Sequence, residues 1–188
     1  MRRAYTLIEI LVVVAIIGVI VAILFPVFSA VRENGRMAKC ISNLHQWGTA
    51  IQMYRDDWGG ADPQPGMKIK SLSELGFPWG APPARFWKTY GLDAPAVRFC
   101  PSAPRQRSGK PSPYYSLFWA DEPLPPEEIQ RKADRGADMA LMVCAFHNRI
   151  PLIEDNPTWG DIRVVVLRLN QQVSVRVVKS YPLDMIAL

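Results

Sequence analysis

The feature that most constrains this chain is a long stretch without charge near its N-terminus. Residues 10–31 contain no Asp, Glu, Lys or Arg and consist mainly of Val, Ile, Leu, Ala and Phe. A helix rises 1.5 Å per residue, so this stretch is long enough to cross a bilayer core of about 30 Å. The apolar core of a conventional secretory signal is shorter, about 7–15 residues. The sequence therefore predicts one transmembrane helix over about residues 7–28.

A single carboxylate, Glu9, lies at the edge of this apolar stretch. A charged side chain costs about 2.5–3.5 kcal/mol at mid-membrane on insertion scales, and less near the end of a span. A charged residue at such a costly position is, by default, expected to have a function. We therefore expect Glu9 to have a partner.

Residues 4–17 resemble the leader junction of type IV pilins and type II secretion pseudopilins. The resemblance implies that prepilin peptidase, a membrane-embedded enzyme, cuts between Ala4 and Tyr5 and methylates the new amine. Glu9 then becomes the fifth mature residue, where the family has its glutamate. Pro26 falls where many members have a proline that kinks the helix. Ala4 stands where the family usually has glycine.

The resemblance also implies a role and a location. Glu9 could pair with the amine of the mature N-terminus, Tyr5, of its own chain or of a neighbouring subunit, and the family uses this pair to set the stagger between subunits of a filament. The expected partners are prepilin peptidase, other pilin or pseudopilin subunits and the inner membrane, with the head in the periplasm or on an extracellular filament. The chain is then a substrate of an enzyme and not an enzyme. Pilus and secretion pseudopilus both remain open, and the alternative is a single-span membrane-anchored binding module that does not polymerise.

The predicted organisation is a leader peptide at 1–4, a long helix at 5–57 and a globular extracytoplasmic head at 58–188. Within the helix, residues 29–57 are amphipathic, because apolar residues recur at alternating spacings of four and three. This stripe comprises Cys40, Leu44, Trp47, Ile51 and Tyr54. Turn formers and glycines at 56–60 predict the end of the helix.

The predicted fold class is α+β: a long N-terminal helix packed on a small antiparallel sheet, with a loop-rich head, which is also the pilin architecture. Most of the seventeen prolines lie in 63–126, which predicts an ordered, loop-rich connection carrying short strands. Predicted strands cover 114–119, 139–146, 162–169 and 172–179, and 125–132 predicts a short helical turn. Asn170 and Gln171 predict a two-residue hairpin. Apolar and polar residues alternate in the last of these strands, which predicts that the side chains of Val173, Val175 and Val177 share one buried face.

Three cysteines in an exported head predict one disulfide and one spare thiol, and they are too few for four-fold zinc ligation. The preferred disulfide joins Cys40 to Cys100 and would fasten a loop to the helix, with Cys144 as a buried apolar residue. Two alternatives remain open: all three cysteines buried and reduced, or a Cys100–Cys144 disulfide. His45 and His147 have no partner at ligand or triad spacing, so both are interpreted as structural, and no metal site or cofactor is predicted.

Other motifs that carry chemistry are not found. The sequence has no H-E-x-x-H, C-x-x-C or G-x-S-x-G. The acidic residues Glu154, Asp155 and Asp161 are better explained as a solvated loop than as a calcium site. The net charge of +5 falls to +3 without the leader arginines, which is too mild to indicate nucleic-acid binding, and Arg105, Arg107 and Lys110 are interpreted as a solvated cluster. No small-molecule substrate is evident.

A weaker resemblance extends beyond the apolar helix. Residues 40–46 and 53–57, with the short motif of residues 100–102, are similar to a large bacterial family of pilin-like proteins named for an H-x9-D-G motif. The terminal Asp-Gly pair of that motif is absent from this sequence. The resemblance therefore suggests a subfamily without adding a site residue.

Overall fold

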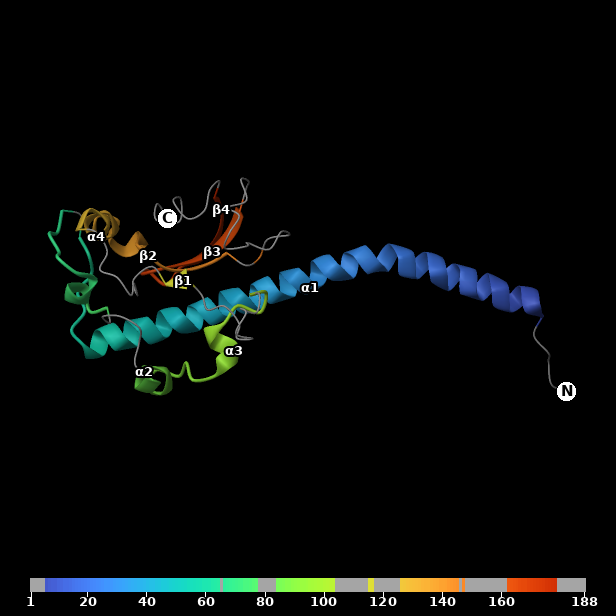
Figure 1. Ribbon diagram of the computed structural model, residues 1–188, viewed down its shortest axis with the longest axis horizontal. Coiled ribbons are helices and arrows are strands. Elements are labelled where there is room, and N and C mark those ends of the chain that lie inside the picture. The colour runs from blue at the N-terminus through green and yellow to red at the C-terminus, as the bar shows by residue number, and fades with distance from the viewer. Residues whose placement is uncertain are drawn as a thin grey trace. The chain divides into compact units, whose positions relative to one another are not determined.

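The computed structural model of the chain describes residues 6–64, 66–77, 84–103, 115–116, 126–145, 147 and 162–178. The longest element is α1 (Leu7–Asp57), the long helix of Figure 1. Its residues are divided between two compact units, Met1–Arg36 and Met37–Leu188. The other elements are η1 (Leu72–Leu75), α2 (Ala84–Thr89), α3 (Pro95–Arg98), β1 (Tyr115–Ser116), α4 (Pro126–Ala133), η2 (Gly136–Asp138), β2 (Ala140–Cys144), β3 (Ile162–Arg168) and β4 (Val173–Val178). The α+β prediction is confirmed.

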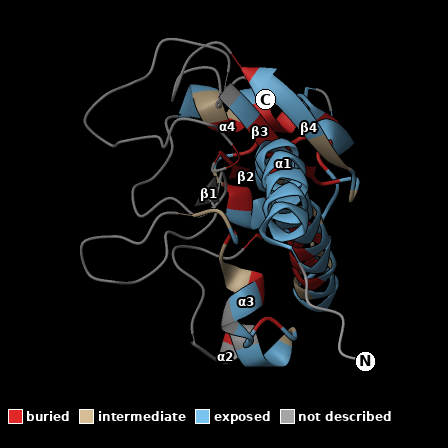
Figure 2. Ribbon diagram, turned by 90° about the vertical axis from the view of Figure 1, so that its right-hand side faces the viewer, coloured by how far each residue is buried: buried red, intermediate tan, exposed pale blue. Residues whose placement is uncertain are grey.

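The strands form one antiparallel sheet in the order β1-β2-β3-β4. Its central strands β2 and β3 are buried on both faces, as the red ribbons of Figure 2 show. One face, with Met142, Cys144 and Leu167, belongs to the main core, and the opposite face, with Val143 and Val166, forms a second cluster. The predicted strands at 139–146, 162–169 and 172–179 are confirmed. Of the one predicted at 114–119, only 115–116 lie among the described residues.

The apolar stripe of α1 after Met37 packs into the main core, as predicted. Cys40, Leu44, Trp47 and Ile51 are buried, and Tyr54 is partly buried against the rings of α2 and the turn that follows it. Two polar side chains of the same face fasten α3 to the helix. Asn43 donates from Nδ2 to the carbonyl of Ala96 at 2.7 Å, and Trp47 donates from Nε1 to the carbonyl of Val97 at 3.1 Å.

The predicted end of α1 is confirmed, and it is closed by a glycine in the left-handed conformation. Gly59 has a φ of +69°, which glycine adopts without a steric penalty. The amide of Gly60 donates to the carbonyl of Arg55 at 2.7 Å, five residues back. This is the Schellman arrangement, in which carbonyls of the last helical turn are satisfied as the chain turns away.

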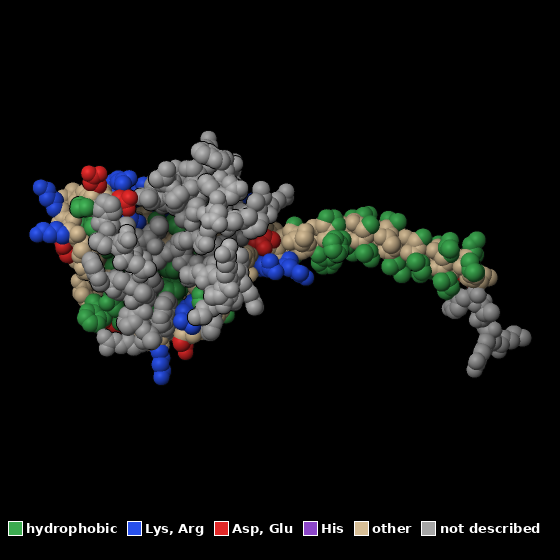
Figure 3. Space-filling model, in the orientation of Figure 1, with side chains coloured by type: hydrophobic (Ala, Val, Ile, Leu, Met, Phe, Trp, Pro, Cys, Tyr) green, Lys and Arg blue, Asp and Glu red, His purple; other side chains and the backbone are tan. Residues whose placement is uncertain are grey.

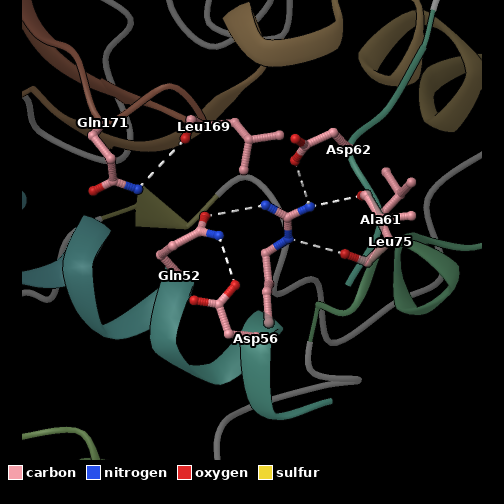
Figure 4. Close-up of polar contacts among 8 residues, drawn as sticks. Gln52, Asp56, Ala61, Asp62, Leu75, Leu169 and Gln171 are labelled. Atoms are coloured by element: carbon pink, nitrogen blue, oxygen red, sulfur yellow. Dashed lines mark hydrogen bonds and ion pairs between the residues drawn. The ribbon is translucent and has the colours of Figure 1, made fainter. Parts of the chain in front are cut away.

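The last turn of α1 also carries a buried guanidinium, that of Arg55, whose side chain is 2% exposed. It donates to the carbonyls of Leu75 at 3.0 Å and Ala61 at 2.7 Å, and to the carboxylate of Asp62 at 3.1 Å (Figure 4). Gln52 accepts a further bond at 3.3 Å. Arg55 therefore ties the helix to two segments that follow it, and sequence reasoning did not single it out.

Two predictions about the head are wrong, and a third is confirmed only in part. The described part of 63–126 contains the short strand β1, as expected, but it also contains the short helices η1, α2 and α3. The first error is the predicted two-residue hairpin. The β3–β4 loop has three residues: the amide of Gln171 donates to the carbonyl of Arg168, that of Arg168 to the carbonyl of Gln172, and Gln171 has a φ of +67°. A turn followed by a left-handed residue is the usual three-residue hairpin, and it needs only one positive φ instead of the two of a type I′ turn.

The second error concerns β4. Val173 packs against the main core, but Val175 and Val177 are 43% and 62% exposed, while Val178 is buried in the second cluster. β4 lies at the end of the strand order, so among the described strands it has a neighbour on one side only. The alternation of apolar and polar residues correctly predicted a strand here. The side chains of its apolar face are, however, increasingly exposed after Val173.

Candidate functional site

The first compact unit is a helix with apolar side chains all around it. Between Leu7 and Val31 the large apolar residues are exposed, with fractions from 44% to 83%, and the most apolar window has a mean hydropathy of 3.3. Figure 3 shows hydrophobic side chains along this part of α1. A helix that is apolar on every side is suited to a membrane or to the core of an assembly. By length and composition, α1 can cross a membrane.

Glu9 has a local partner that sequence reasoning missed. Thr6 precedes the first helical residue, and its amide and hydroxyl both donate to Oε2 of Glu9, at 2.7 and 2.8 Å. The amide of Glu9 donates to Oγ1 of Thr6 at 3.4 Å. This is a capping box, in which residues three apart satisfy each other's amides at the start of a helix. The spacing Thr-x-x-Glu is legible in the sequence and could have revealed it.

The other predicted residues of this unit are only partly described. Ala4 and Tyr5 lie outside the described residues, so the cleavage site and the pairing of its amine stay predictions. α1 continues through Pro26, whose carbonyl accepts a hydrogen bond from the hydroxyl of Ser29 at 2.8 Å. The kink at Pro26 also stays a prediction.

In the head, four side chains from three separate segments meet. Cys40 comes from α1, Cys100 follows α3, Cys144 ends β2, and His147 lies three residues further on. One ligand atom from each, the three Sγ atoms and a ring nitrogen, lie within 4.8 Å of one another. Nε2 of His147 is 3.2 Å from Sγ of Cys100. We call these four residues the Cys–His cluster.

The cluster changes the interpretation of the cysteines and of His147. The structure describes all three cysteines and contains no disulfide among them, so the predicted Cys40–Cys100 bond is not confirmed. His147, which was interpreted as a structural histidine without a partner at ligand spacing in the sequence, lies beside the three thiols in the fold. Counting cysteines alone missed the fourth donor, although the spacing Cys144-x-x-His147 was a local signal for it. His45, in contrast, is exposed on α1.

Burial and mutual contact perturb the acidity of the thiols. Hydrogen bonds with Cys144 and Cys40, and then with His147, lower the pKa of the Cys100 thiol. Burial raises the pKa of the Cys144 thiol, and its hydrogen bond to Cys100 acts in the same direction. Negative charge in this pocket is therefore favoured at Cys100 and disfavoured at Cys144.

The remaining predicted groups lie in 104–114 and 148–161, outside the described residues. They are the basic residues Arg105, Arg107 and Lys110 and the acidic residues Glu154, Asp155 and Asp161.

Comparison with known proteins identifies the N-terminal motif. Residues 1–25 match the family model of the prokaryotic N-terminal methylation motif, the signature of type IV pilin-like proteins. The match covers the leader junction and most of the uncharged stretch, and it ends before the head begins. No curated protein and no solved structure matches the chain.

Proposed function

We propose that this chain is a structural subunit of a filament of the type IV pilus or type II secretion pseudopilus kind, and not an enzyme. The observation that carries the proposal is the combination of the N-terminal methylation motif with an exposed, uniformly apolar helix in the same residues. Prepilin peptidase would remove residues 1–4 and methylate Tyr5. The apolar part of α1 would then hold the subunit in the inner membrane and later pack in the filament core.

The exposed side chains of this unit need an apolar environment, which either lipid or neighbouring helices can supply. Burying a large aliphatic or aromatic side chain is worth about 1.5–3 kcal/mol, and this unit exposes such residues from Leu7 to Val31. Lipid covers them before assembly, and neighbouring helices replace lipid afterwards. Helices that are equally apolar on all sides can pack at many staggers, so a charge at one position is needed to select one of them.

Glu9 meets that need in the proposed filament. In the single subunit its carboxylate is held by Thr6 in the capping box. In the assembly the carboxylate of Glu9 would form an ion pair with the methylated N-terminal amine of Tyr5 in a neighbouring subunit. In a low dielectric the attraction within an ion pair roughly offsets the cost of desolvating its two charges, whereas an unpaired charge costs several kcal/mol. A wrong stagger would leave both the carboxylate and the amine unpaired, so it is disfavoured by both costs.

Filament membership can be tested in the organism that encodes the chain. Surface filaments are sheared off, and the head is detected by antibody in the sheared and membrane fractions of two strains, with and without prepilin peptidase. We expect the chain in the sheared fraction only when the peptidase is present. A chain that stays in the membrane fraction of both strains would indicate the anchored binding module instead, provided that an established pilin is sheared normally from the same cells.

A further inference from the structure

The Cys–His cluster is not used by the proposed filament function, and its position in the head core requires another explanation. We propose that Cys40, Cys100, Cys144 and His147 together bind one zinc ion, which holds α1, the segment after α3 and the end of β2 in place. The donor set is Cys3His, one of the standard sets of structural zinc sites.

The distances between the donors suit a tetrahedral ion. Zinc bonds of about 2.3 Å to sulfur and about 2.0–2.1 Å to nitrogen place donors about 3.5–3.8 Å apart in a tetrahedron. Each of the four ligand atoms lies within 4.8 Å of the others, and the Cys100–His147 pair is 3.2 Å apart. Shifts of about 1 Å or less would therefore bring all four to bonding distance of one central ion.

The surrounding structure holds the donors in position. Asn43 and Trp47, one and two turns after Cys40 on the same helix, donate to carbonyls of α3, which leads directly to Cys100. The amide of Ser102 donates to Sγ of Cys100 at 3.4 Å. Donors to a ligand atom orient it and stabilise its charged form, as the outer shell of a metal site does. The amide of Ala103 then closes a turn on the carbonyl of Cys100 at 3.0 Å.

The burial of all four residues indicates a structural zinc site and not a catalytic one. The exposed fractions of the four residues are 0%, 3%, 0% and 5% in chain order. Four protein donors complete the coordination of zinc, so no open position remains for a substrate or a catalytic water. A disulfide would use only two of the three sulfurs and would leave the imidazole of His147 without a role in the bond. Zinc uses all four donors.

The experiment measures metal in the full-length chain, purified in detergent without a polyhistidine tag and with a reductant that does not chelate. Elemental analysis should find about one zinc per chain, as a four-donor site requires. We expect His147→Ala and Cys144→Ser to lower the zinc content at least tenfold. His45→Ala is the matched control, because His45 is the other histidine of the chain and is exposed. It should keep the full zinc content.

A second measurement covers variants that fail to fold. The wild-type chain is stripped with a chelator and titrated with zinc or cobalt(II). Zinc should restore the melting temperature lost on stripping, and cobalt should give the absorption of a tetrahedral thiolate site. Three results would overturn the proposal. The first is a reduced wild-type chain that takes up no more zinc than His147→Ala. The second is a disulfide in the native chain, seen by mass spectrometry as a mass two hydrogens lower and a pair of peptides linked through cysteines, and the third is stoichiometric copper in place of zinc. None of them bears on filament assembly, so the two proposals fail separately.

Discussion

Glu9→Ala is expected to leave membrane insertion intact and to remove the chain from sheared filaments. Insertion depends on the apolar residues of α1, which the change leaves in place and makes slightly more apolar. Assembly loses the acceptor for the amine of the neighbouring subunit, and an unpaired buried charge costs several kcal/mol. About 2.7 kcal/mol corresponds to a hundredfold change in an equilibrium, so incorporation should fall by about 100-fold or more. Quantitative immunoblotting of sheared and membrane fractions measures both effects.

The capping box offers a second explanation for such a loss, and two further variants separate the explanations. Glu9→Gln keeps a side-chain oxygen that can accept from the Thr6 amide, since glutamine also serves in capping boxes, but it lacks the charge. Thr6→Ala keeps the charge and removes the hydroxyl bonded to Glu9. If charge pairing between subunits matters, Glu9→Gln assembles as poorly as Glu9→Ala, and Thr6→Ala assembles. The opposite pattern would show that Glu9 acts only as a helix cap, where loss costs about 0.5–2 kcal/mol.

Arg55→Met is expected to give a clear loss of head stability. The methionine would fill part of the space but leave the carbonyls of Leu75 and Ala61 without their donor. The bond to Leu75 is buried, whereas that to Ala61 is only partly so. A buried polar group that loses its partner costs about 1–3 kcal/mol, so we expect the free energy of unfolding to fall by about that amount. Thermal unfolding of the full-length chain in detergent, followed by near-UV circular dichroism, measures the effect.

Asp62→Asn is the matched control for this change. The Asp62 side chain is 72% exposed, and exposed ion pairs contribute about 0–1 kcal/mol. We therefore expect a small effect that shrinks with added salt, whereas the effect of Arg55→Met should be nearly independent of salt. A large, salt-sensitive loss in Asp62→Asn, with little change in Arg55→Met, would mean that the ion pair and not the carbonyl contacts stabilises this corner.

Sequence alone was sufficient for the parts of the fold that depend on local periodicity. The spacing of Cys40, Leu44, Trp47 and Ile51 fixed the buried face of α1, because residues three and four apart share one side of a helix. The glycines after Asp57 fixed its end. The apolar run before Cys144 and the alternating run after Gln171 were each sufficient to predict a strand.

Several of the errors concern contacts between distant segments, which local spacing does not encode. Whether Val177 is buried depends on what covers β4, and the alternation of its residues is the same in either case. Cys40, Cys100 and Cys144 are far apart in sequence and meet only because helix, loop and sheet converge. Arg55 was overlooked for the same reason, since its acceptors lie in segments beyond the helix.

The chemical state of the N-terminus tests the central claim most directly. Protein isolated from the native membrane or from filaments is digested, and its N-terminal peptide is identified by mass spectrometry. The account predicts a peptide that begins at Tyr5, with a methyl group on its amine. A chain that still begins at Met1 with its two arginines, in cells that process another prepilin normally, would contradict it.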